Sequence, residues 1–362
     1  MHDTPVEVIE RHVVQQLVSP TGYSQYLAGD IGHGELRRFT PEIVKLSQAY
    51  TAHSVGSKLR EVTDTELRAE AYALYYLPIN AAKIAHLALS LPPAKKTLRV
   101  LDFGSGPGTA ALALLATLPL TLEITCVESS ESMRRVATKL LSSWQGPSTI
   151  ASLNMIPRMP RDWSESFDIV IAANSFAELG EQDATALVSR LAHLVSPEGF
   201  LMLLEPGQQA HSRRLMRIRD SLVPQLTPLF PCTHMAACPM LQASSTDWCH
   251  GTLAWRQPPL NRQLDALLGF NKHRIKYSGF VFQQGGRLRP GARVIVPAEK
   301  TQRGIEVTVC GDQFYGVVRI KKGQRTDGSR ALERASVFDR IESSEPLRSE
   351  LSPTLVTTRC SP

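Results

Sequence analysis

The 362-residue sequence has little of the features that mark several whole classes of protein. Its 6 cysteines are too few to build a disulfide scaffold. It has no uninterrupted apolar run near the ~20 residues that a membrane-spanning helix needs. The most apolar segment, Thr109–Val127, is broken by Pro119 and Glu123. These absences exclude a disulfide-rich secreted scaffold and an integral membrane protein.

The first residues also lack a targeting signature. MHDTPVEVIERH has no basic start followed by an apolar core, as a secretory signal has, and it is not Arg-rich and acid-poor like a mitochondrial transit peptide. The sequence therefore predicts a cytoplasmic protein. What is present is a hydrophobic content of 43%, which is enough for a packed core, in a chain long enough for two or three domains.

The net charge of +6 is unevenly distributed along the chain. Residues 211–325 hold 18 Lys and Arg against 6 Asp and Glu, a net charge of +12, whereas residues 1–210 carry −5 and residues 326–362 carry −1. A concentrated basic segment is typical of proteins that bind a polyanion such as RNA. A solvated basic surface without such a partner is the alternative, and charge alone does not decide between them.

Patterns of apolar residues divide the chain into four parts. Residues 1–95 are predicted to be helical, 96–210 to alternate strands with helices, 211–340 to form a basic, four-cysteine and β-rich module, and 341–362 to form a disordered tail. Alternating strands and helices predict an α/β domain with a parallel sheet covered on both faces. Short β runs, the first at Tyr277–Gln283, predict a small sheet in the third part.

Within the helical part, Thr63 and Glu66 have the spacing of a capping box, which predicts a helix start there. Pro78 predicts a break between this helix and a second one over Ile79–Leu91, because proline cannot donate the hydrogen bond of a helix interior. Three tyrosines of the first helix are interpreted as core and helix-contact residues rather than a base-stacking platform: Tyr72, Tyr75 and Tyr76.

A glycine-rich turn follows the first predicted strand of the α/β part and opens a helix. It reads Asp102-Phe103-Gly104-Ser105-Gly106-Pro107-Gly108. Glycines allow the backbone to turn tightly and to approach a ligand at the carboxyl end of the sheet. Glu128 ends the next predicted strand, where a carboxylate can accept both hydroxyls of a ribose.

The spacing of the glycines distinguishes two cofactors. A dinucleotide site requires G-x-G-x-x-G, whereas this loop is D-x-G-x-G-x-G. An acid before the loop suits the ammonium end of S-adenosylmethionine (SAM), directly or through water. The loop resembles motif I of the class I SAM methyltransferases; a dinucleotide site and a vestigial loop are the alternatives. The cofactor-binding candidates are Asp102, Gly104, Gly106, Gly108 and Glu128.

The catalytic residue is harder to find, because methyl transfer mainly requires positioning. Asn174 is the candidate: it follows the strand Phe167–Ala173, where amino-methyltransferases carry an N-P-P-Y-like motif, but the prolines are missing, so it is equally a hydrogen-bonding strand end. Cys126 lies in an apolar strand, and no Pro-Cys or Thr-Cys pair at this edge supports a cysteine nucleophile. Asp162 and Trp163 are left unassigned as adenine contacts.

Four of the cysteines fall in the basic segment: Cys232, Cys238, Cys249 and Cys310. Four thiolates can hold Zn²⁺ or an iron–sulfur cluster, and the spacing C-x5-C-x10-C-x60-C does not choose between them. Proline after the second cysteine and tryptophan before the third favour a shaped site over four unrelated buried cysteines. His234 and His250 are interpreted as neighbours of this site or nucleic-acid contacts rather than ligands.

Seven segments carry a resemblance when they are taken together. They are AEAYALYYLP (69–78), VLDFGSGPGT (100–109), LLEPG (203–207), PCTHMAACP (231–239), DWCH (247–250), KYSGFVF (276–282) and RVIVP (293–297). In this combination the chain resembles the mitochondrial small-ribosomal-subunit methyltransferase-like assembly factors and their bacterial relatives. The cysteine text is the most specific part of the resemblance.

The resemblance implies a fold, cofactors and a partner. The fold is α/β, a class I SAM-methyltransferase (Rossmann-like) sheet with an N-terminal helical region and a C-terminal cysteine cluster plus small β module. The cofactors are SAM and a 4Fe–4S cluster, with zinc as the alternative metal, and the implied ligands are Cys232, Cys238, Cys249 and Cys310. The implied partner is the small ribosomal subunit and its rRNA.

The sequence therefore predicts a SAM-dependent methyltransferase-like protein that acts on or binds small-subunit rRNA in ribosome assembly or translation. A non-catalytic RNA-binding assembly factor, in which SAM and the cluster only hold the fold, is the first alternative. A small-molecule methyltransferase with a zinc-stapled substrate domain is the second, and the +12 segment argues against it.

Overall fold

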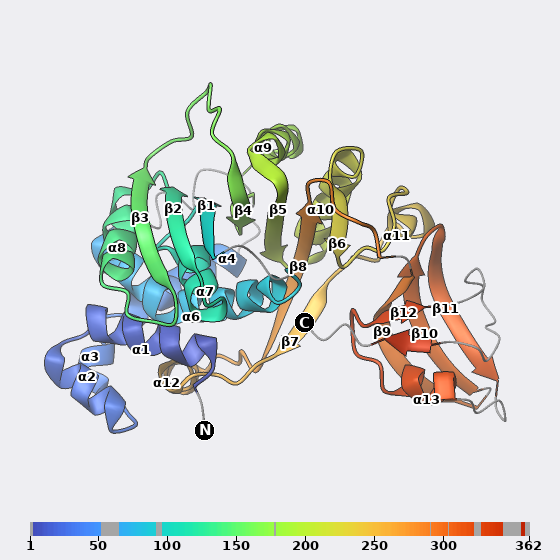
Figure 1. Ribbon diagram of the computed structural model, residues 1–362. Coiled ribbons are helices and arrows are strands. Elements are labelled where there is room, and N and C mark those ends of the chain that lie inside the picture. The colour runs from blue at the N-terminus through green and yellow to red at the C-terminus, as the bar shows by residue number, and fades with distance from the viewer. Residues whose placement is uncertain are drawn as a thin grey trace.

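A central mixed sheet organises the protein. The computed structural model describes residues 3–51, 65–91, 96–176, 179–289, 291–302, 304–321, 327–342 and 356–358. The strands of the central sheet are β1 (Thr97–Phe103), β2 (Thr121–Val127), β3 (Thr149–Ile156), β4 (Phe167–Ala173), β5 (Val195–Pro206), β6 (Thr227–Phe230), β7 (Gly251–Ala254) and β8 (Arg274–Gln283). Their order is β3-β2-β1-β4-β5-β8-β6, and β7 pairs with β8 (Figure 1).

The direction of the strands identifies the class of sheet. Strands β1 to β5 pair in parallel, whereas β8 runs antiparallel to β5, β6 and β7. The order of the parallel strands reverses at β1, with β2 and β3 on one side and β4 and β5 on the other, and the antiparallel strand β8 lies beside β5. This is the arrangement of the class I methyltransferases. The predicted α/β methyltransferase sheet is confirmed at this level.

The register places the two candidate cofactor segments on one edge. Thr97 of β1 pairs with Thr121 of β2, and Phe103 pairs with Val127, so the strands start and end together. The glycine loop after Phe103 and Glu128 after Val127 therefore emerge side by side at the carboxyl edge of the sheet. This edge is where open α/β sheets bind their ligands.

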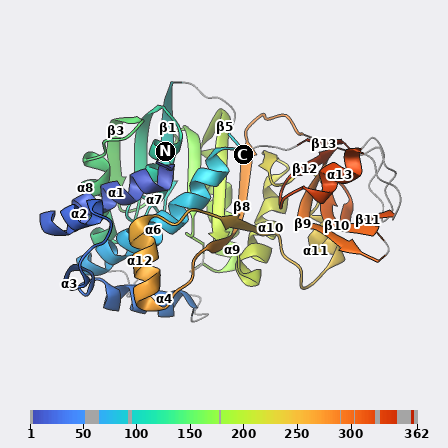
Figure 2. The same cartoon turned by 90° about the horizontal axis from the view of Figure 1, so that it is seen from below.

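Helices cover the sheet in two groups. The first group packs together around α6 and comprises α1 (Pro5–Leu17), α4 (Thr40–Thr51), α6 (Glu66–Ala88), α7 (Thr109–Thr117), α8 (Glu131–Ser142) and α12 (Pro259–Leu268). The second group packs on β5 and comprises α9 (Glu181–His193) and α10 (Gln209–Leu222). Figure 2 shows α12 lying against α6 and α4 although it is far from them in the sequence. Two short helices, α2 (Pro20–Leu27) and α3 (His33–Leu36), follow α1.

Helix α6 is continuous through Pro78, so the predicted break at that residue is wrong. Proline removes the donor that would have bonded the carbonyl of Leu74, four residues earlier. The Asn261 side-chain amide of α12 supplies the replacement, since its Nδ2 lies 3.4 Å from the Leu74 oxygen and 3.2 Å from the Tyr75 oxygen. The helix begins after the N-cap Thr65, whose side chain accepts the Arg68 amide; the predicted cap Thr63 lies outside the described residues.

The Asn261 contact predicts a measurable loss of stability. Replacing Asn261, which is buried, with Leu removes the donor and leaves the Leu74 carbonyl without a partner. We expect the free energy of unfolding to fall by ~1–3 kcal/mol, the cost of an unsatisfied buried polar group. Chemical denaturation followed by circular dichroism measures it. Asn271→Leu, on an exposed neighbouring residue, is the control, and equal effects of the two variants would contradict this account of α6.

The N-terminal helices are tied to α12 by a buried carboxylate. Glu10 of α1 accepts the amides of Leu260 and Asn261, at 2.8 and 2.9 Å, and the hydroxyl of Tyr26 at 3.1 Å. These are free amides of the first turn of α12, so Glu10 caps that helix from a distance in sequence. Burial raises the pKa of Glu10 to about 7.

A second sheet forms the small β module. It has the order β11-β10-β9-β12-β13 and lies to one side of the central sheet, beside β6 and α11 (Pro239–Ala243) (Figure 1). Its strands are β9 (Ala292–Thr301), β10 (Gly304–Gly311), β11 (Phe314–Lys321), β12 (Arg340–Glu342) and β13 (Val356–Thr358), with helix α13 (Asp327–Glu333). It has its own apolar core, which includes Val294, Val309 and Val318.

Two expectations about this module need correction. The run Tyr277–Gln283 belongs to β8 of the central sheet, because it is buried almost throughout and a strand buried on both faces needs layers on either side. Val356–Thr358, within the tail predicted to be disordered, form β13 and pair with β12; most of residues 341–362 lie outside the described part. The four-part division of the chain stays a prediction. Among the described residues, no helix is long and apolar enough to cross a membrane.

Candidate functional site

The glycine loop joins β1 to α7 at the carboxyl edge. Gly104, Gly106 and Gly108 have positive φ angles of 67°, 54° and 83°, which glycine adopts without strain. A Cβ on Gly104 would collide with the Ser175 side chain and one on Gly108 would press on Leu141, whereas a Cβ on Gly106 would meet no heavy atom within 4 Å. The loop is therefore packed at both ends and open at Gly106.

Glu128 lies beside this opening. Its carboxylate accepts the amide of Gly106 at 2.9 Å and the amide of Ser130 at 2.7 Å, and its side chain is half-buried. Each carboxylate oxygen has two lone pairs. Glu128 therefore keeps the capacity to accept ribose hydroxyls while it shapes the glycine loop.

Asp102 is enclosed more completely than its predicted role suggests. It is 1% exposed, and its Oδ2 accepts the Ala111 amide of α7 at 3.1 Å. Burial raises the pKa of Asp102 to about 7, and the negative charge of Glu128 adds to this increase. The carboxylate fastens the first turn of α7 to the end of β1. The cofactor-binding role of Asp102 stays a prediction.

Asn174 occupies the predicted place at the end of β4. Its φ angle of 55° is left-handed, a conformation that asparagine tolerates. Its backbone amide donates to the Leu204 carbonyl at 2.7 Å, and the hydroxyl of Ser175 donates to the Phe103 carbonyl at 2.9 Å. The segment is thus held between β1 and β5 at the carboxyl edge. The catalytic role of Asn174 stays a prediction.

Glu205, at the end of β5, is a residue whose importance sequence reasoning missed. It is 1% exposed, and burial raises its pKa to about 7. Its Oε1 accepts the Phe176 amide at 3.0 Å, while its buried Oε2 has no hydrogen-bond partner and lies 3.8 Å from His211 Nδ1 and 3.9 Å from Arg214 Nη2. The signal in the sequence was an acid directly after the apolar run of a central strand.

The tyrosines of α6 divide between core and site. Tyr75 is fully buried and donates its hydroxyl to Asp265 at 2.6 Å, which confirms it as a core residue. Tyr72 and Tyr76 are half-buried. Burial raises the pKa of Tyr72 to about 12, and the charges of Glu128 and Asp102 contribute to this. Tyr72 therefore lies close to the cofactor candidates.

Two residues considered from the sequence lie elsewhere. Cys126 is fully buried within β2. The Trp163 ring packs edge-on against Phe167, 5.3 Å between centroids, and Phe167 is the first residue of β4. Trp163 thus lies at the amino edge of the sheet, away from the glycine loop.

The four cysteines of the basic segment gather where the two sheets meet. Cys232 follows β6, Cys238 caps α11, Cys249 precedes β7, and Cys310 lies in β10. Burial raises the pKa of the Cys249 thiol well above its usual value, and the charges of the other three cysteines raise it further. Thiols from segments up to 78 positions apart in the sequence therefore act on one another through their charges, and their role as a ligand set stays a prediction.

The predicted metal site is nevertheless not formed as a ligand set. Across the described parts of the chain, no three His, Cys, Asp or Glu side chains converge as a group that could hold a metal ion. Burial raises the pKa of the Cys232 thiol, and the positive charge of Arg219 partly offsets this. The charges of the four thiols act on one another, but the thiols do not have the arrangement of metal ligands.

Several arginines of the basic segment have structural roles. Arg213 donates to the carbonyls of Ser244 and Asp247, Arg219 to those of His234 and Ala236, and Arg293 to those of Pro231 and Phe338. Arg219 and Arg293 are buried. Part of the +12 charge therefore ties the cysteine-bearing loops together. The exposed remainder includes Arg256, Arg262, Arg274, Lys276, Arg287, Arg289 and Lys300.

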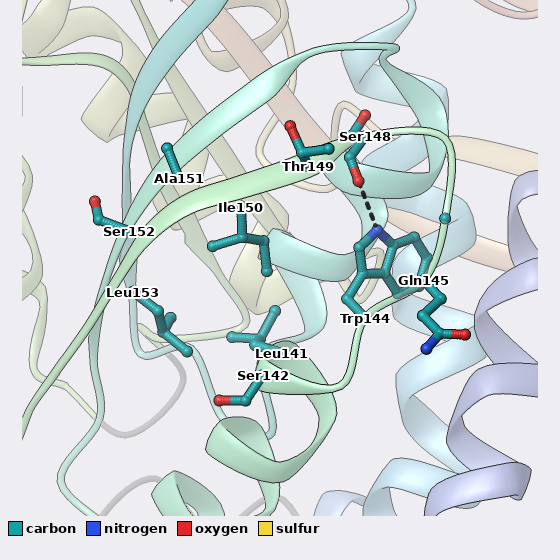
Figure 3. A pocket seen from close by; sticks show the side chains of 11 residues that line it. Leu141, Ser142, Trp144, Gln145, Ser148, Thr149, Ile150, Ala151, Ser152 and Leu153 are labelled. Carbon is teal, nitrogen blue, oxygen red and sulfur yellow. Dashed lines mark hydrogen bonds between the residues drawn. The ribbon is translucent and has the colours of Figure 1, made fainter.

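A shallow depression of about 550 Å³ lies between the end of α8 and β3. Figure 3 shows Trp144 along its wall, with the indole Nε1 donating to the Ser148 carbonyl at 3.2 Å. Thr149, another lining residue, is the first residue of β3 and pairs with Thr121 at the start of β2. The depression is therefore distant from the carboxyl edge and separate from the candidate site.

Solved structures similar to this chain include two methyltransferases. One is a putative RNA methyltransferase from Pyrococcus horikoshii, with 16% identity, a TM-score of 0.35, and coverage of 57% of this chain and 82% of that chain. The other is magnesium protoporphyrin IX methyltransferase from Synechocystis PCC 6803 with bound SAM, with 13% identity, a TM-score of 0.37, and coverage of 67% and 96%.

Curated relatives include Rsm22-cox11 tandem proteins 1 and 2, mitochondrial, from Schizosaccharomyces pombe. Each is 27% identical over 186 residues, which cover 47% of this chain and 24% of the relative. The match thus spans about a quarter of the length of these relatives. Both relatives are mitochondrial by name, so the predicted cytoplasmic location conflicts with this comparison and is wrong. The first residues of the sequence were not a sufficient guide to the compartment.

One protein family matches most of the chain. The family described as mitochondrial small ribosomal subunit Rsm22 matches residues 67–332, from the second residue of α6 to the end of α13. The match includes the glycine loop, Glu128, Glu205 and all four cysteines of the basic segment. The chain belongs to the Rsm22 family of the mitochondrial small ribosomal subunit.

Proposed function

We propose that this chain is a SAM-dependent methyltransferase-like protein that acts on or binds small-subunit ribosomal RNA. The observation that carries the proposal is the glycine loop at the carboxyl edge of a methyltransferase-type sheet, open at Gly106 and flanked by Glu128. The family supplies the ribosomal context.

The residues present fit SAM. Glu128 would accept the ribose hydroxyls, the open backbone at Gly106 would approach the cofactor, and the charge of Asp102 would favour its ammonium group. Thr109 Oγ1, at the start of α7, is buried without a hydrogen-bond partner. Bound SAM supplies an electrophilic methyl group; the chain supplies position and a site shielded from water.

The RNA partner is supported by exposed positive charge. Seven exposed cations lie along the segment from Arg256 to Lys300. For a single-stranded rRNA site, log K should fall with log salt with a slope of ~0.7 per phosphate contacted. Crosslinking and sequencing of bound RNA tests the proposal most directly, because it identifies both the partner and the methylation candidate. Recovery of no small-subunit rRNA would contradict it.

We propose that the four cysteines hold a metal centre, a 4Fe–4S cluster or, as the alternative, zinc. Support comes from the donor type, from the mutual proximity of the thiols, and from the buried Arg219 and Arg293 beside Cys232, whose positive charges offset a thiolate. To bind a metal, the four thiols must come closer together than they do in the arrangement described above.

Metal content tests this assignment. Protein purified without oxygen is expected to be brown, with absorbance near ~400 nm and with bound iron and sulfide, and Cys249→Ser is expected to lose them. Cys126→Ser, in β2, is the matched control and should keep them. A colourless protein with one equivalent of zinc would select the alternative, and a protein with neither metal would refute the site.

A non-catalytic assembly factor is the second candidate function. It is favoured by the residues that follow β4, where Ser175 and Phe176 stand in place of the two prolines of the N-P-P-Y-like motif. If a variant that cannot bind SAM still supports small-subunit assembly, catalysis is not the essential role.

A further inference from the structure

A polar stripe runs along the otherwise apolar helix α6. Tyr72, Tyr76, Asn80 and Lys83 are spaced by four, four and three residues, which places them on one face of the helix. The remainder of α6 is dominated by buried Ala, Leu and Ile side chains. A polar face on a buried helix is costly unless it serves a ligand or is fully paired.

Hydrogen bonds join three of the four members of the stripe. Asn80 Nδ2 donates to the Tyr72 hydroxyl at 3.0 Å, and Lys83 Nζ donates to Asn80 Oδ1 at 2.9 Å. Asn80 and Lys83 are each 8% exposed, and Tyr72 is half-buried. The stripe is therefore enclosed but not sealed.

The two ends of the stripe lie at different parts of the carboxyl edge. At one end, Tyr72 is close enough to Glu128 and Asp102 for their charges to act on it. At the other end, burial and the positive charge of Lys272 lower the pKa of Lys83 to about 8, and the carboxylate of Glu205 partly offsets this. The stripe thus extends from the cofactor candidates to the end of β5.

Polar groups around Lys83 are incompletely paired. Glu205 Oε2 and Arg214 Nη2 are both buried and form an ion pair at 3.9 Å, but neither atom has a hydrogen-bond partner. Among the ion pairs of the described residues, none joins Lys83 to Glu205. Lys83 therefore has no carboxylate partner among the ion pairs of the described residues. Its ammonium is held by Asn80 instead, which leaves donor capacity for a ligand.

We propose that this stripe is the acceptor-facing wall of the cofactor site and that Lys83 donates a hydrogen bond to an oxygen of the acceptor nucleotide, either a base carbonyl or a phosphate. The inference rests on the proposed function and adds to it the residue that recognises the acceptor. The Tyr72 end then borders the cofactor, and the Lys83 end borders the nucleotide.

The test compares Lys83→Met with Lys139→Met, an exposed lysine on α8. Methionine keeps the length of the side chain and removes its charge. The probes are SAM and an in vitro transcript of small-subunit rRNA. For Lys83→Met we expect a melting temperature within about three degrees of wild type, because removal of a buried charge offsets the loss of the hydrogen bond to Asn80. We also expect SAM affinity within threefold of wild type, and transcript affinity of the SAM-bound protein lowered about tenfold or more.

Salt dependence separates the two sources of the oxygen. If Lys83 contacts a phosphate, the slope of log K against log salt falls by ~0.7 in magnitude in the variant; if it contacts a base carbonyl, the slope is unchanged. Lys139→Met should match wild type in melting temperature and SAM affinity.

Three results would overturn the inference. A melting temperature several degrees lower would make Lys83 structural. A large loss of SAM affinity would assign it to the cofactor. Transcript affinity equal to wild type would leave it without a role in acceptor binding. If wild-type protein binds neither SAM nor the transcript, the proposed function itself fails and the inference with it, which is distinguishable from failure of the variant alone.

Discussion

Gly106→Leu is expected to reduce SAM affinity by at least about 100-fold while the protein remains folded. Gly106 has a φ angle of 54°, and a Cβ placed on it meets no heavy atom within 4 Å. A leucine side chain would therefore occupy the opening beside Glu128 where the cofactor is proposed to lie. Losing a well-packed ligand contact and its hydrogen bonds easily exceeds the ~2.7 kcal/mol that a 100-fold change requires.

Backbone strain needs a control, because any side chain at positive φ costs ~1–2 kcal/mol. Gly269, at the C-terminus of α12, has a φ angle of 67° and also meets no neighbouring atom within 4 Å. Gly269→Leu should produce a similar loss of stability with unchanged SAM affinity. Isothermal titration calorimetry measures the affinity. If Gly106→Leu binds SAM as tightly as Gly269→Leu, the cofactor is not bound at this loop.

Arg219→Met is expected to destabilise the cysteine-bearing loops by ~3–5 kcal/mol, the cost of breaking a buried charge network. Arg219 is 1% exposed and donates to the carbonyls of Ala236 and His234, each at 2.5 Å, and to Asp220 at 2.7 Å. Asp220 in turn accepts the Cys238 amide at 3.0 Å. The substitution leaves two carbonyls and a carboxylate without their donor.

Thermal unfolding and thiol labelling measure this effect. Cysteines of the loop should react faster with a thiol reagent in Arg219→Met, because local opening exposes them. Arg217→Met is the matched control: it lies on the same helix, is exposed, and pairs only with Glu181 among the ion pairs of the described residues. Its expected cost is below ~1 kcal/mol. Equal effects of the two variants would refute the structural role of Arg219.

The candidate site was predictable where the signal is local. Three glycines after a strand, and an acid at the end of the next strand, specify a backbone turn and its position on the sheet. These residues do meet at the carboxyl edge. Glu205 was not identified, because its role depends on accepting the amide of Phe176, which follows β4 and lies 29 positions away in the sequence.

Helix α6 shows why local rules fail for buried segments. Pro78 predicts a helix break because it lacks a donor, yet Asn261 supplies that donor to Leu74 from far along the chain. The basic segment shows the same limit, since charge counting cannot separate exposed arginines from Arg219 and Arg293, which are buried as ties between loops.

The sequence by itself determined the α/β class and the position of the glycine loop between a strand and a helix, because periodicity and glycine spacing are local properties. The tertiary structure decided the continuity of α6, the placement of Tyr277–Gln283 in the central sheet, and the arrangement of Lys83 and Glu205 at its carboxyl edge. Each of these depends on a partner from a distant segment that satisfies a buried polar group or covers a buried face.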